Sequence, residues 1–465
     1  MSTDKKVTEK YTDLYASPEK IYPRQVYGLF AKLRIFTVFL LLGFYYVTPW
    51  LTWNGEQAVL FDLPARQFRY FAVTFWPQDF IYLTLLLIIA AVGLFLFTTI
   101  AGRLWCGYAC PQTVWTETFL WIEELVEGNR NKRMKLDKSP WNLNKILRKS
   151  TKHFLWITFA LFTGYTFVGY FSPIKELGIG IIELNLGPWE WFWVLFYSLA
   201  TYGNAGWLRE QVCLHMCPYA RFQSSMFDKD TLIISYDKLR GESRGRRKKN
   251  SDYKAKGLGD CIDCNQCVHV CPTGIDIRDG LQYECIACAA CIDVCDNVME
   301  KMGYDQGLIK YTTEVEEKSQ GKEKTHFFRA RTIYYSSIFV AVIGIFFYLL
   351  TNRIPIDINV IRDRNALYNE TFSGHIENTY TLKILNMSQQ TQNYNLLVAG
   401  YENIVIEGDT NFDIASGDVL ILPVRIKIHG DQLKQRSNPI DFVIETTGEH
   451  PYKSTTTAKF LGPKK

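Results

Sequence analysis

The chain has 465 residues, enough for about three domains, so a small single-domain enzyme is not expected. It has 52 Lys and Arg residues and 47 Asp and Glu residues, and this net charge of +5 is too small to indicate a nucleic-acid binder. No nucleic-acid motif is found either. Hydrophobic residues make up 48% of the chain and gather in long runs between charged segments, which predicts a membrane protein.

Five apolar runs are long enough to cross a bilayer as helices, which takes about 20 residues. They lie at 34–53, 80–101, 153–171, 189–207 and 333–351. The run 80–101 has no charged residue, whereas 189–207 carries Glu190 and Asn204 and is rich in Trp, as at a membrane interface. Because the first run follows about 33 polar residues and is itself of span length, we expect an anchor and not a cleaved signal peptide.

The loops between these runs alternate in positive charge. Lys and Arg number seven in 1–34, two in 54–79, ten in 102–152 and one in 172–188. Since cytoplasmic loops keep positive charge, the odd number of spans predicts an exported C-terminus. The predicted parts are a cytoplasmic N-terminal segment 1–33, a four-span membrane domain 34–207 with the cytoplasmic loop 102–152, a cytoplasmic ferredoxin domain 208–332 (core 258–300) with the basic flank Arg244–Lys249, a fifth transmembrane helix 333–351 and a periplasmic domain 355–465.

Two cysteine pairs follow membrane runs, and each reads C-x3-C-P. The four residues are Cys106, Cys110, Cys213 and Cys217. The spacing of each pair puts both thiols on one face of a helix, and the proline disfavours helix at the second cysteine. These thiols are candidate Cu(I) ligands, and His215 and Met216 are weaker copper-ligand candidates. A further iron-sulfur cluster, a cycling thiol/disulfide pair and a set of merely buried cysteines remain alternatives.

The other eight cysteines form two C-x2-C-x2-C-x3-C motifs. In two-cluster ferredoxins the fourth cysteine of each motif binds the cluster of the other motif. The spacing therefore assigns a first [4Fe-4S] cluster to Cys261, Cys264, Cys267 and Cys295. It assigns a second cluster to Cys285, Cys288, Cys291 and Cys271. The third cysteine of each run argues against a zinc ribbon, and the absence of C-x2-C-H excludes covalent c-type haem.

The C-terminal residues 355–465 alternate apolar and polar residues between Gly, Asn, Asp and Pro breaks. About seven short strands fit this pattern. A domain of about 110 residues with such strands is typical of an immunoglobulin-like sandwich, here without a cysteine pair. The predicted fold is thus an α-helical integral membrane protein of about five spans, with an inserted two-cluster ferredoxin domain and a C-terminal all-β immunoglobulin-like sandwich. We expect the sandwich to be a structural or partner-docking module.

The stretch Cys271-PTGIDIRDGLQYECIACAACIDVCD, with the two C-x3-C-P motifs before it and the strand-rich tail, resembles the cytochrome c oxidase accessory protein family known as CcoG, FixG or RdxA. The resemblance implies a multi-pass protein of the bacterial inner membrane that assists assembly of a cbb3-type oxidase. It implies cupric reductase activity at the four C-x3-C-P cysteines, with copper as substrate or bound ion. It also implies partners among oxidase assembly factors and a copper transporter or chaperone.

Two other functions fit the same motifs. One is a ferredoxin subunit of a quinol-linked respiratory electron-transfer complex, which would bind no copper. The other is a redox-sensing assembly scaffold whose exported domain docks oxidase subunits. All three need a cytoplasmic electron donor or redox partner that the sequence does not identify, and they leave a homodimer open.

Overall fold

The computed structural model describes residues 20–249, 251–319, 322–364, 366–388, 390–447 and 452–463. The chain divides into two compact units, whose structure we describe one at a time. Unit 1 comprises, as far as it is described, Met1–Tyr46, Gly93–Phe167 and Gly187–Ser336. Unit 2 comprises, with the same restriction, Val47–Val92, Val168–Leu186 and Ser337–Lys465. Each unit is therefore built from three separate segments of the sequence.

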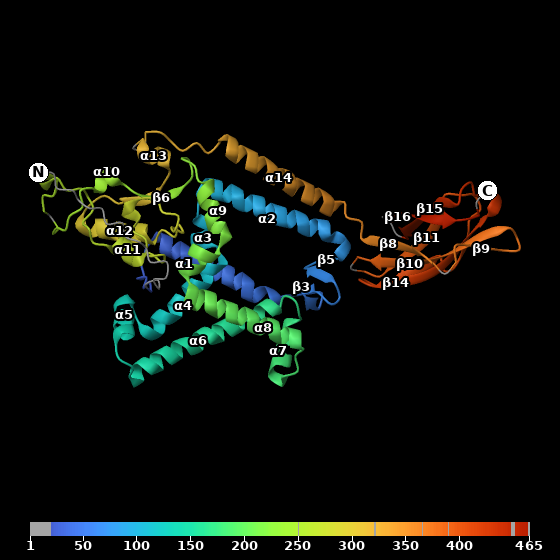
Figure 1. Ribbon diagram of the computed structural model, residues 1–465, viewed down its shortest axis with the longest axis horizontal. Coiled ribbons are helices and arrows are strands. Elements are labelled where there is room, and N and C mark those ends of the chain that lie inside the picture. The colour runs from blue at the N-terminus through green and yellow to red at the C-terminus, as the bar shows by residue number, and fades with distance from the viewer. Residues whose placement is uncertain are drawn as a thin grey trace, which may run out of the picture. The chain divides into compact units, whose positions relative to one another are not determined.

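Three helical stretches are long and apolar enough to cross a membrane: Leu29–Trp50, Pro77–Ala101 and Ala330–Thr351. They contain α1 (Leu29–Val47), α2 (Phe80–Ala101) and α14 (Ala330–Thr351). Figure 1 shows α2 and α14 side by side, and the contacts make them antiparallel. The Tyr82 hydroxyl donates to the Leu349 carbonyl at 3.0 Å near one end, and Arg329 donates to the Thr99 carbonyl at 2.5 Å near the other. Three of the five expected spans are thus confirmed as membrane-length helices.

The two remaining expected spans are helical but less clearly membrane segments. Helix α6 (Leu143–Val168) is apolar only in its second half, because its first turns carry Lys145, Arg148, Lys149 and Lys152. Helix α8 (Pro188–Thr201) has 14 residues and runs on into a π-helical segment, Tyr202–Leu208. Whether 153–171 and 189–207 cross the bilayer therefore stays a prediction.

In unit 2, the expected loop 54–79 forms short strands. They are β1 (Thr52–Trp53), β2 (Glu56–Gln57), β3 (Val59–Asp62), β4 (Gln67–Tyr70) and β5 (Val73–Phe75), with β3, β4 and β5 as an antiparallel meander. Gln57 joins this loop to the end of α6 and to α7 (Ile174–Glu183), since its amide donates to the Gly169 carbonyl at 2.7 Å and accepts from the Ile174 N–H at 3.0 Å. The Phe61 N–H also donates to the Tyr170 carbonyl, at 2.7 Å.

Unit 1 carries both kinds of cysteine motif on short helices. After α2 come α3 (Leu104–Tyr108), α4 (Pro111–Glu127) and α5 (Arg130–Lys138), and the second C-x3-C-P motif leads into α9 (Pro218–Met226). The ferredoxin part contains α10 (Lys238–Gly241), α11 (Gln266–Val270), α12 (Ala290–Met302) and α13 (Glu314–Lys318) (Figure 1). Strands β6 (Ile233–Tyr236) and β7 (Ile309–Thr312) pair antiparallel and bracket both ferredoxin motifs in the sequence.

The C-terminal part of unit 2 is a sandwich of two antiparallel sheets. One sheet contains β8 (Ile356–Arg362), β9 (Asn369–Glu370), β10 (His375–Asn386), β12 (Val405–Glu407) and β14 (Val419–His429). The other contains β11 (Gln392–Ala399), β13 (Asn411–Ile414), β15 (Ser437–Thr446) and β16 (Lys453–Leu461). The described residues thus form nine strands, two more than the pattern predicts.

The sandwich core follows the alternation of its strands, since successive side chains point to opposite faces. In β10, Tyr380, Leu382 and Ile384 are fully buried, and they pack with Phe442 and Ile444 of β15. The predicted immunoglobulin-like core is therefore formed by the apolar positions of the sequence pattern.

We predict that Leu382→Ala destabilises the sandwich by about 2–5 kcal/mol, because it removes buried methyl groups and leaves a cavity. Leu397→Ala is the matched control, since Leu397 is 44% exposed on β11 and should cost no more than roughly 0.5 kcal/mol. Pulse proteolysis of the C-terminal domain in urea, on the full-length protein in detergent, measures both values. Equal losses for the two variants would contradict the assigned core.

Candidate iron-sulfur and thiol site

The two ferredoxin motifs have the same backbone conformation. Asp263 and Asn265 in the first motif have φ of 52° and 55°, and Ala287 and Ala289 at the same positions of the second have φ of 53° and 59°. Left-handed conformations are uncommon for residues other than Gly. Their recurrence at matched positions shows that the two cysteine runs wrap in the same way.

The cysteines assigned to the second cluster gather around one cavity. Its lining includes Cys271, Cys285, Cys288 and Cys291, together with Cys267 of the first set. The Ala287 N–H also points to the Cys285 sulfur at 3.4 Å, a donor of the kind that surrounds cluster thiolates. The donor set and its arrangement therefore fit a [4Fe-4S] cluster, which would supply one-electron redox chemistry.

The cysteines assigned to the first cluster are also neighbours. Burial raises the pKa of Cys295, and Cys267, Cys261 and Cys264 raise this pKa further because their thiolates lie close by. The fourth cysteine of the second motif thus lies with the first three of the first motif, as crossed ligation requires. Cys264 is the one exposed cysteine among the twelve, so the first cluster site is the one nearer to solvent.

The two C-x3-C-P motifs end in the same backbone hydrogen bond, from the N–H of the second cysteine to the carbonyl five residues before it. The Cys110 N–H donates to the Trp105 carbonyl at 2.9 Å, and the Cys217 N–H donates to the Val212 carbonyl at 2.8 Å. Each second cysteine is extended and precedes a proline that begins the next helix, so the predicted helix end is confirmed. The predicted α-helical face is wrong for the second pair, because Val212–Met216 is π-helical, whereas Cys106 of the first pair lies in the α-helix Leu104–Tyr108. π-helical turns are frequent at functional sites.

The four membrane-edge thiols lie near one another. Burial raises the pKa of Cys106 to about 12, with Cys110 and Cys213 adding to the increase. Burial likewise raises the pKa of Cys213 to about 12, with contributions from Cys110 and Cys217. Within the described residues, no three His, Cys, Asp or Glu side chains are arranged to hold a single metal ion. His215 and Met216 are exposed, so their copper-ligand role stays a prediction.

Gly107, between the cysteines of the first pair, touches the second ferredoxin motif. A Cβ atom added to Gly107 would lie 2.7 Å from the Ile286 carbonyl oxygen and 2.9 Å from the Cys288 Cα atom. Cys106 packs against the same apolar group, which includes Ile286 and Cys288. The second cluster site and the first thiol pair are thus in direct backbone contact, and only glycine permits this approach.

Arg103 connects the same parts. Its guanidinium donates to the Tyr283 carbonyl, just before Cys285, and to the Ala220 carbonyl in α9. In addition, the Cys106 thiol donates to Gln223 of α9 at 3.3 Å. Sequence reasoning missed Gly107 and Arg103. The sequence does contain a hint of the role of Gly107. The residue after the first cysteine is glycine in the first pair, Gly107, but leucine in the second pair, Leu214.

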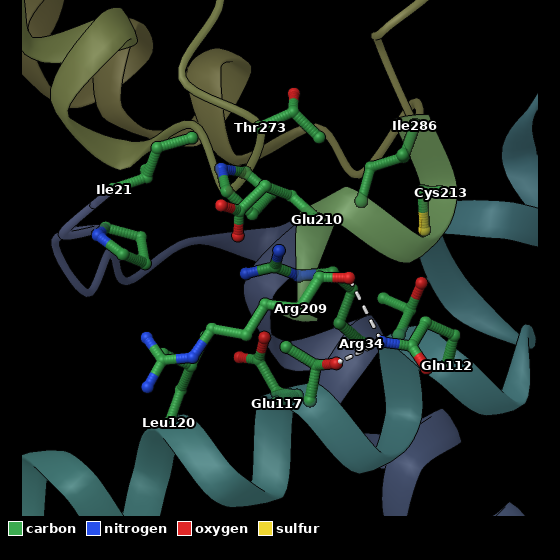
Figure 2. Close-up of a pocket in the computed structure, with 14 residues that line it drawn as sticks. Ile21, Arg34, Gln112, Glu117, Leu120, Arg209, Glu210, Cys213, Thr273 and Ile286 are labelled. Carbon is green, nitrogen blue, oxygen red and sulfur yellow. Dashed lines mark hydrogen bonds between the residues drawn. The ribbon is translucent and has the colours of Figure 1, made fainter. Parts of the chain in front are cut away.

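Figure 2 shows a cavity beside the thiols, between the loop of the ferredoxin motifs and helix α4. Cys213 and Ile286 lie at one end of it, and the side chains of Glu117, Glu210 and Arg34 also line it. Gln112 ties α4 to the segment before Cys213, because its amide donates to the Arg209 carbonyl at 3.1 Å. The Cys213 thiol therefore faces space that a small ion or molecule can fill.

A buried carboxylate holds the two C-x3-C-P motifs together. Glu123 of α4 is fully buried and pairs with Arg209 at 2.9 Å and Arg133 at 3.3 Å. Burial alone would raise the pKa of Glu123, but Arg209, Lys20, Lys152 and Arg133 together lower it to about 2. Glu123 is therefore ionised at neutral pH and links the helix after the first pair to the segment before the second.

A second buried carboxylate fixes the ferredoxin part to α1. Asp293, between Cys291 and Cys295, accepts from the Ala31 N–H at 2.7 Å and from the Phe30 N–H at 3.2 Å. These N–H groups belong to the first turn of α1, where a negative charge is stabilising. This cap explains why α1 begins at Leu29, five residues before the expected span.

Comparison with known proteins identifies the class of protein that these sites define. A 4Fe-4S dicluster domain family matches residues 208–314, and a family described as an IG-like fold at the C-terminal of FixG matches 346–463. A 4Fe-4S binding domain family matches 83–133. The chain is thus an iron-sulfur protein with a ferredoxin domain, membrane-length helices and an immunoglobulin-like domain.

The similarity to individual proteins extends over most of the chain. Protein RdxB of Cereibacter sphaeroides is 40% identical over 85% of both chains. The nitrogen fixation protein FixG of Rhizobium meliloti is 38% identical over 83% of this chain and 80% of its own. A crystal structure of a FixG-related protein from Vibrio parahaemolyticus is 33% identical over 23% of this chain and 95% of its own, with a TM-score of 0.21. The chain belongs to the FixG/RdxA family of iron-sulfur electron-transfer proteins.

We predict that Gly107→Val weakens retention of the second cluster, because the added side chain collides with the backbone of Ile286 and Cys288. Iron in the anaerobically purified protein should fall from about eight atoms per chain toward about four. Electron paramagnetic resonance of the reduced protein should show loss of one cluster signal. Gly43→Ala is the control, since nothing lies within 4 Å of its added Cβ. Wild-type iron and spectra in Gly107→Val would contradict the contact.

Proposed function

We propose that this protein passes single electrons from its two clusters to the four membrane-edge thiols, where Cu(II) is reduced to Cu(I) for assembly of a cbb3-type oxidase. One observation carries the electron path: the Gly107 backbone lies against Ile286 and Cys288 of the second cluster motif. Because electron transfer slows steeply with distance, the contact makes the second cluster the donor to the thiols. In the chemical step Cu(II) gains one electron, and one reduced cluster loses one.

The donor types support copper as the acceptor. Cu(II) favours nitrogen and oxygen ligands, whereas Cu(I) favours thiolate. The cavity in Figure 2 offers both kinds, with Glu117 and Glu210 at its wall and the Cys213 thiol at one end. An ion admitted on carboxylate oxygens would therefore bind the thiols more strongly once reduced. A copper transporter or chaperone and oxidase assembly factors are the partners that this role requires.

A second candidate is a quinol-linked electron-transfer subunit whose membrane-edge thiols hold a further iron-sulfur cluster. The family match favours it, since the 4Fe-4S binding domain covers 83–133 and the cysteines in that range are Cys106 and Cys110. The two candidates differ in metal content. About twelve iron atoms per chain, with four lost in Cys106→Ala, would select the second candidate.

We also propose a five-span arrangement in the bacterial inner membrane, with the ferredoxin domain cytoplasmic and the sandwich periplasmic. The Lys and Arg alternation supports it. The contacts support it too, because the segments 54–79, 172–186 and 355–465, all expected outside, belong to unit 2. The ferredoxin domain and the sandwich each lie on the same side of the membrane whether the chain has three spans or five. Only the side of the membrane on which the α7 segment lies depends on whether α6 and α8 cross the bilayer.

For the chemistry, we predict that replacing Cys213 and Cys217 together with Ser leaves the visible spectrum of the clusters intact. Bound copper and the rate of Cu(II)-driven reoxidation of the reduced protein should both fall by at least about tenfold, because soft ligands are lost. Anaerobic stopped-flow absorbance and metal analysis measure these quantities.

Cys264→Ser is the matched control for that pair. It should keep copper binding and lose turnover, because it removes a ligand of the first cluster and none of the membrane-edge thiols. Undiminished Cu(II) reduction by a variant with all four membrane-edge cysteines changed to Ala, at wild-type iron content, would show that copper is reduced without them.

For the topology, we predict that Ile182→Cys reacts with a membrane-impermeant maleimide in intact spheroplasts. Ile182 is 84% exposed in α7, and the five-span arrangement places it outside. All twelve native cysteines are expected inside or at the cytoplasmic edge, so the unmodified protein is the background control. Labelling of Ile182→Cys only after the membrane is permeabilised would limit the protein to three spans.

A further inference from the structure

A run of cations lies against the loop of the first cluster. We name residues 244–249 and 251–256 the basic segment, which carries seven Lys and Arg residues and one acid, Asp252. The Gly245 N–H donates to the Cys261 carbonyl at 3.3 Å, and the Arg247 guanidinium donates to the same carbonyl at 3.5 Å. The basic segment is therefore attached to the backbone of a cluster ligand.

Aromatic side chains hold this attachment in place. The Arg247 guanidinium lies over the ring of Tyr253 at 4.3 Å and over that of Tyr304 at 5.2 Å, and it donates to the Tyr304 hydroxyl at 3.0 Å. A cation placed over the face of an aromatic ring is held there by electrostatic attraction. Arg247 thus serves as an anchor, and its neighbours are presented around the first cluster site.

The neighbouring cations are exposed and available. Arg246, Lys248, Lys249 and Lys256 are exposed and form no salt bridge with any residue that the structure describes. Of the neighbouring acids in the sequence, Glu242 pairs with Arg244 at 3.0 Å, Asp260 with Arg240 at 2.6 Å and Asp263 with Arg278 at 2.8 Å. With seven cations against one acid, the basic segment therefore places net positive charge beside the loop of Cys261, which also carries the exposed Cys264.

We infer that this basic segment is the docking surface for an acidic one-electron carrier protein, which reduces the first cluster through the face at Cys264. Charge complementarity selects such a partner, because a positive patch steers a negatively charged protein and raises its association rate. Weak electron-transfer complexes need only small interfaces, so a patch of this size is sufficient. Electrons would then enter at the first cluster and leave through the second, beside Gly107.

The inference rests on the proposed electron-transfer function but not on copper. The other occupant of a basic segment near a membrane is the anionic lipid surface. We favour the carrier because the segment is bonded to the loop of a cluster ligand that leads to an exposed cysteine, which lipid binding does not require.

The test uses full-length protein in nanodiscs and a reduced plant-type [2Fe-2S] ferredoxin, which is acidic, as the probe. The variant combines Arg246→Glu, Lys248→Glu and Lys249→Glu. The matched control combines Lys132→Glu, Lys135→Glu and Lys138→Glu, which reverse three exposed lysines on α5. Uncharged photoreduced 5-deazariboflavin serves as a second reductant that does not need a docking surface.

At low salt, the rate at which the ferredoxin reduces the triple variant should be lower than the wild-type rate by a factor of about ten or more. Added salt should lower the rates of the wild type and the α5 control but not that of the triple variant. Deazariboflavin should reduce all three proteins equally, which shows intact clusters. Equal ferredoxin rates in the variant and the wild type, or equal slowing in the α5 control, would overturn the inference. So would amide-exchange protection of 244–249 by anionic lipid alone. A failure of copper reduction would leave these rates unchanged, so the two proposals fail separately.

Discussion

The backbone contact between Gly107 and the Ile286–Cys288 stretch is the constraint on which the proposed electron path depends. A thiol pair at the membrane edge and a cluster motif almost 180 residues later in the chain meet there without a side chain between them. Burial of both sides keeps water away, which keeps electrostatic interactions strong and limits reorganisation around the cysteines. A larger residue at 107 would separate the two sites, so the glycine acts through distance and not through chemistry of its own.

Buried ion pairs and caps make this contact rigid. Glu123, on the helix after the first thiol pair, binds Arg209 before the second pair and Arg133 of α5, and Asp293 binds the second ferredoxin motif to the start of α1. Removing one partner of such a buried pair is costly, typically about 3–5 kcal/mol, because a charge is left uncompensated. Since the pKa of Glu123 is lowered to about 2, the stability contributed by the ionised Glu123 is present at neutral pH and is lost as the pH falls toward 2.

Local patterns in the sequence predict the ferredoxin motifs, the apolar helices and the alternating strands, because spacing and periodicity are properties of neighbouring residues. The crossed cysteine sets follow from the same spacing, and the structure brings Cys295 to the first set and Cys271 to the second. The role of Gly107, the Arg103 contacts and the Asp293 cap depend on residues distant in sequence, which no local pattern reveals. The α-helical face predicted for the second thiol pair is wrong for a different reason, because Val212–Met216 forms a π-helical turn, which the spacing of the cysteines does not distinguish from an α-helical one.

We propose that electrons leave through the second cluster to an acceptor bound at the membrane-edge thiols. Freeze-quench electron paramagnetic resonance tests it directly, because fully reduced protein mixed with one equivalent of Cu(II) can be frozen at successive times and each signal followed separately. If the second cluster is the donor, the Cu(II) signal and the signal of the second reduced cluster should disappear together, and the first cluster should be oxidised afterwards. Loss of the first cluster's signal together with that of Cu(II), while the second cluster stays reduced, would contradict it.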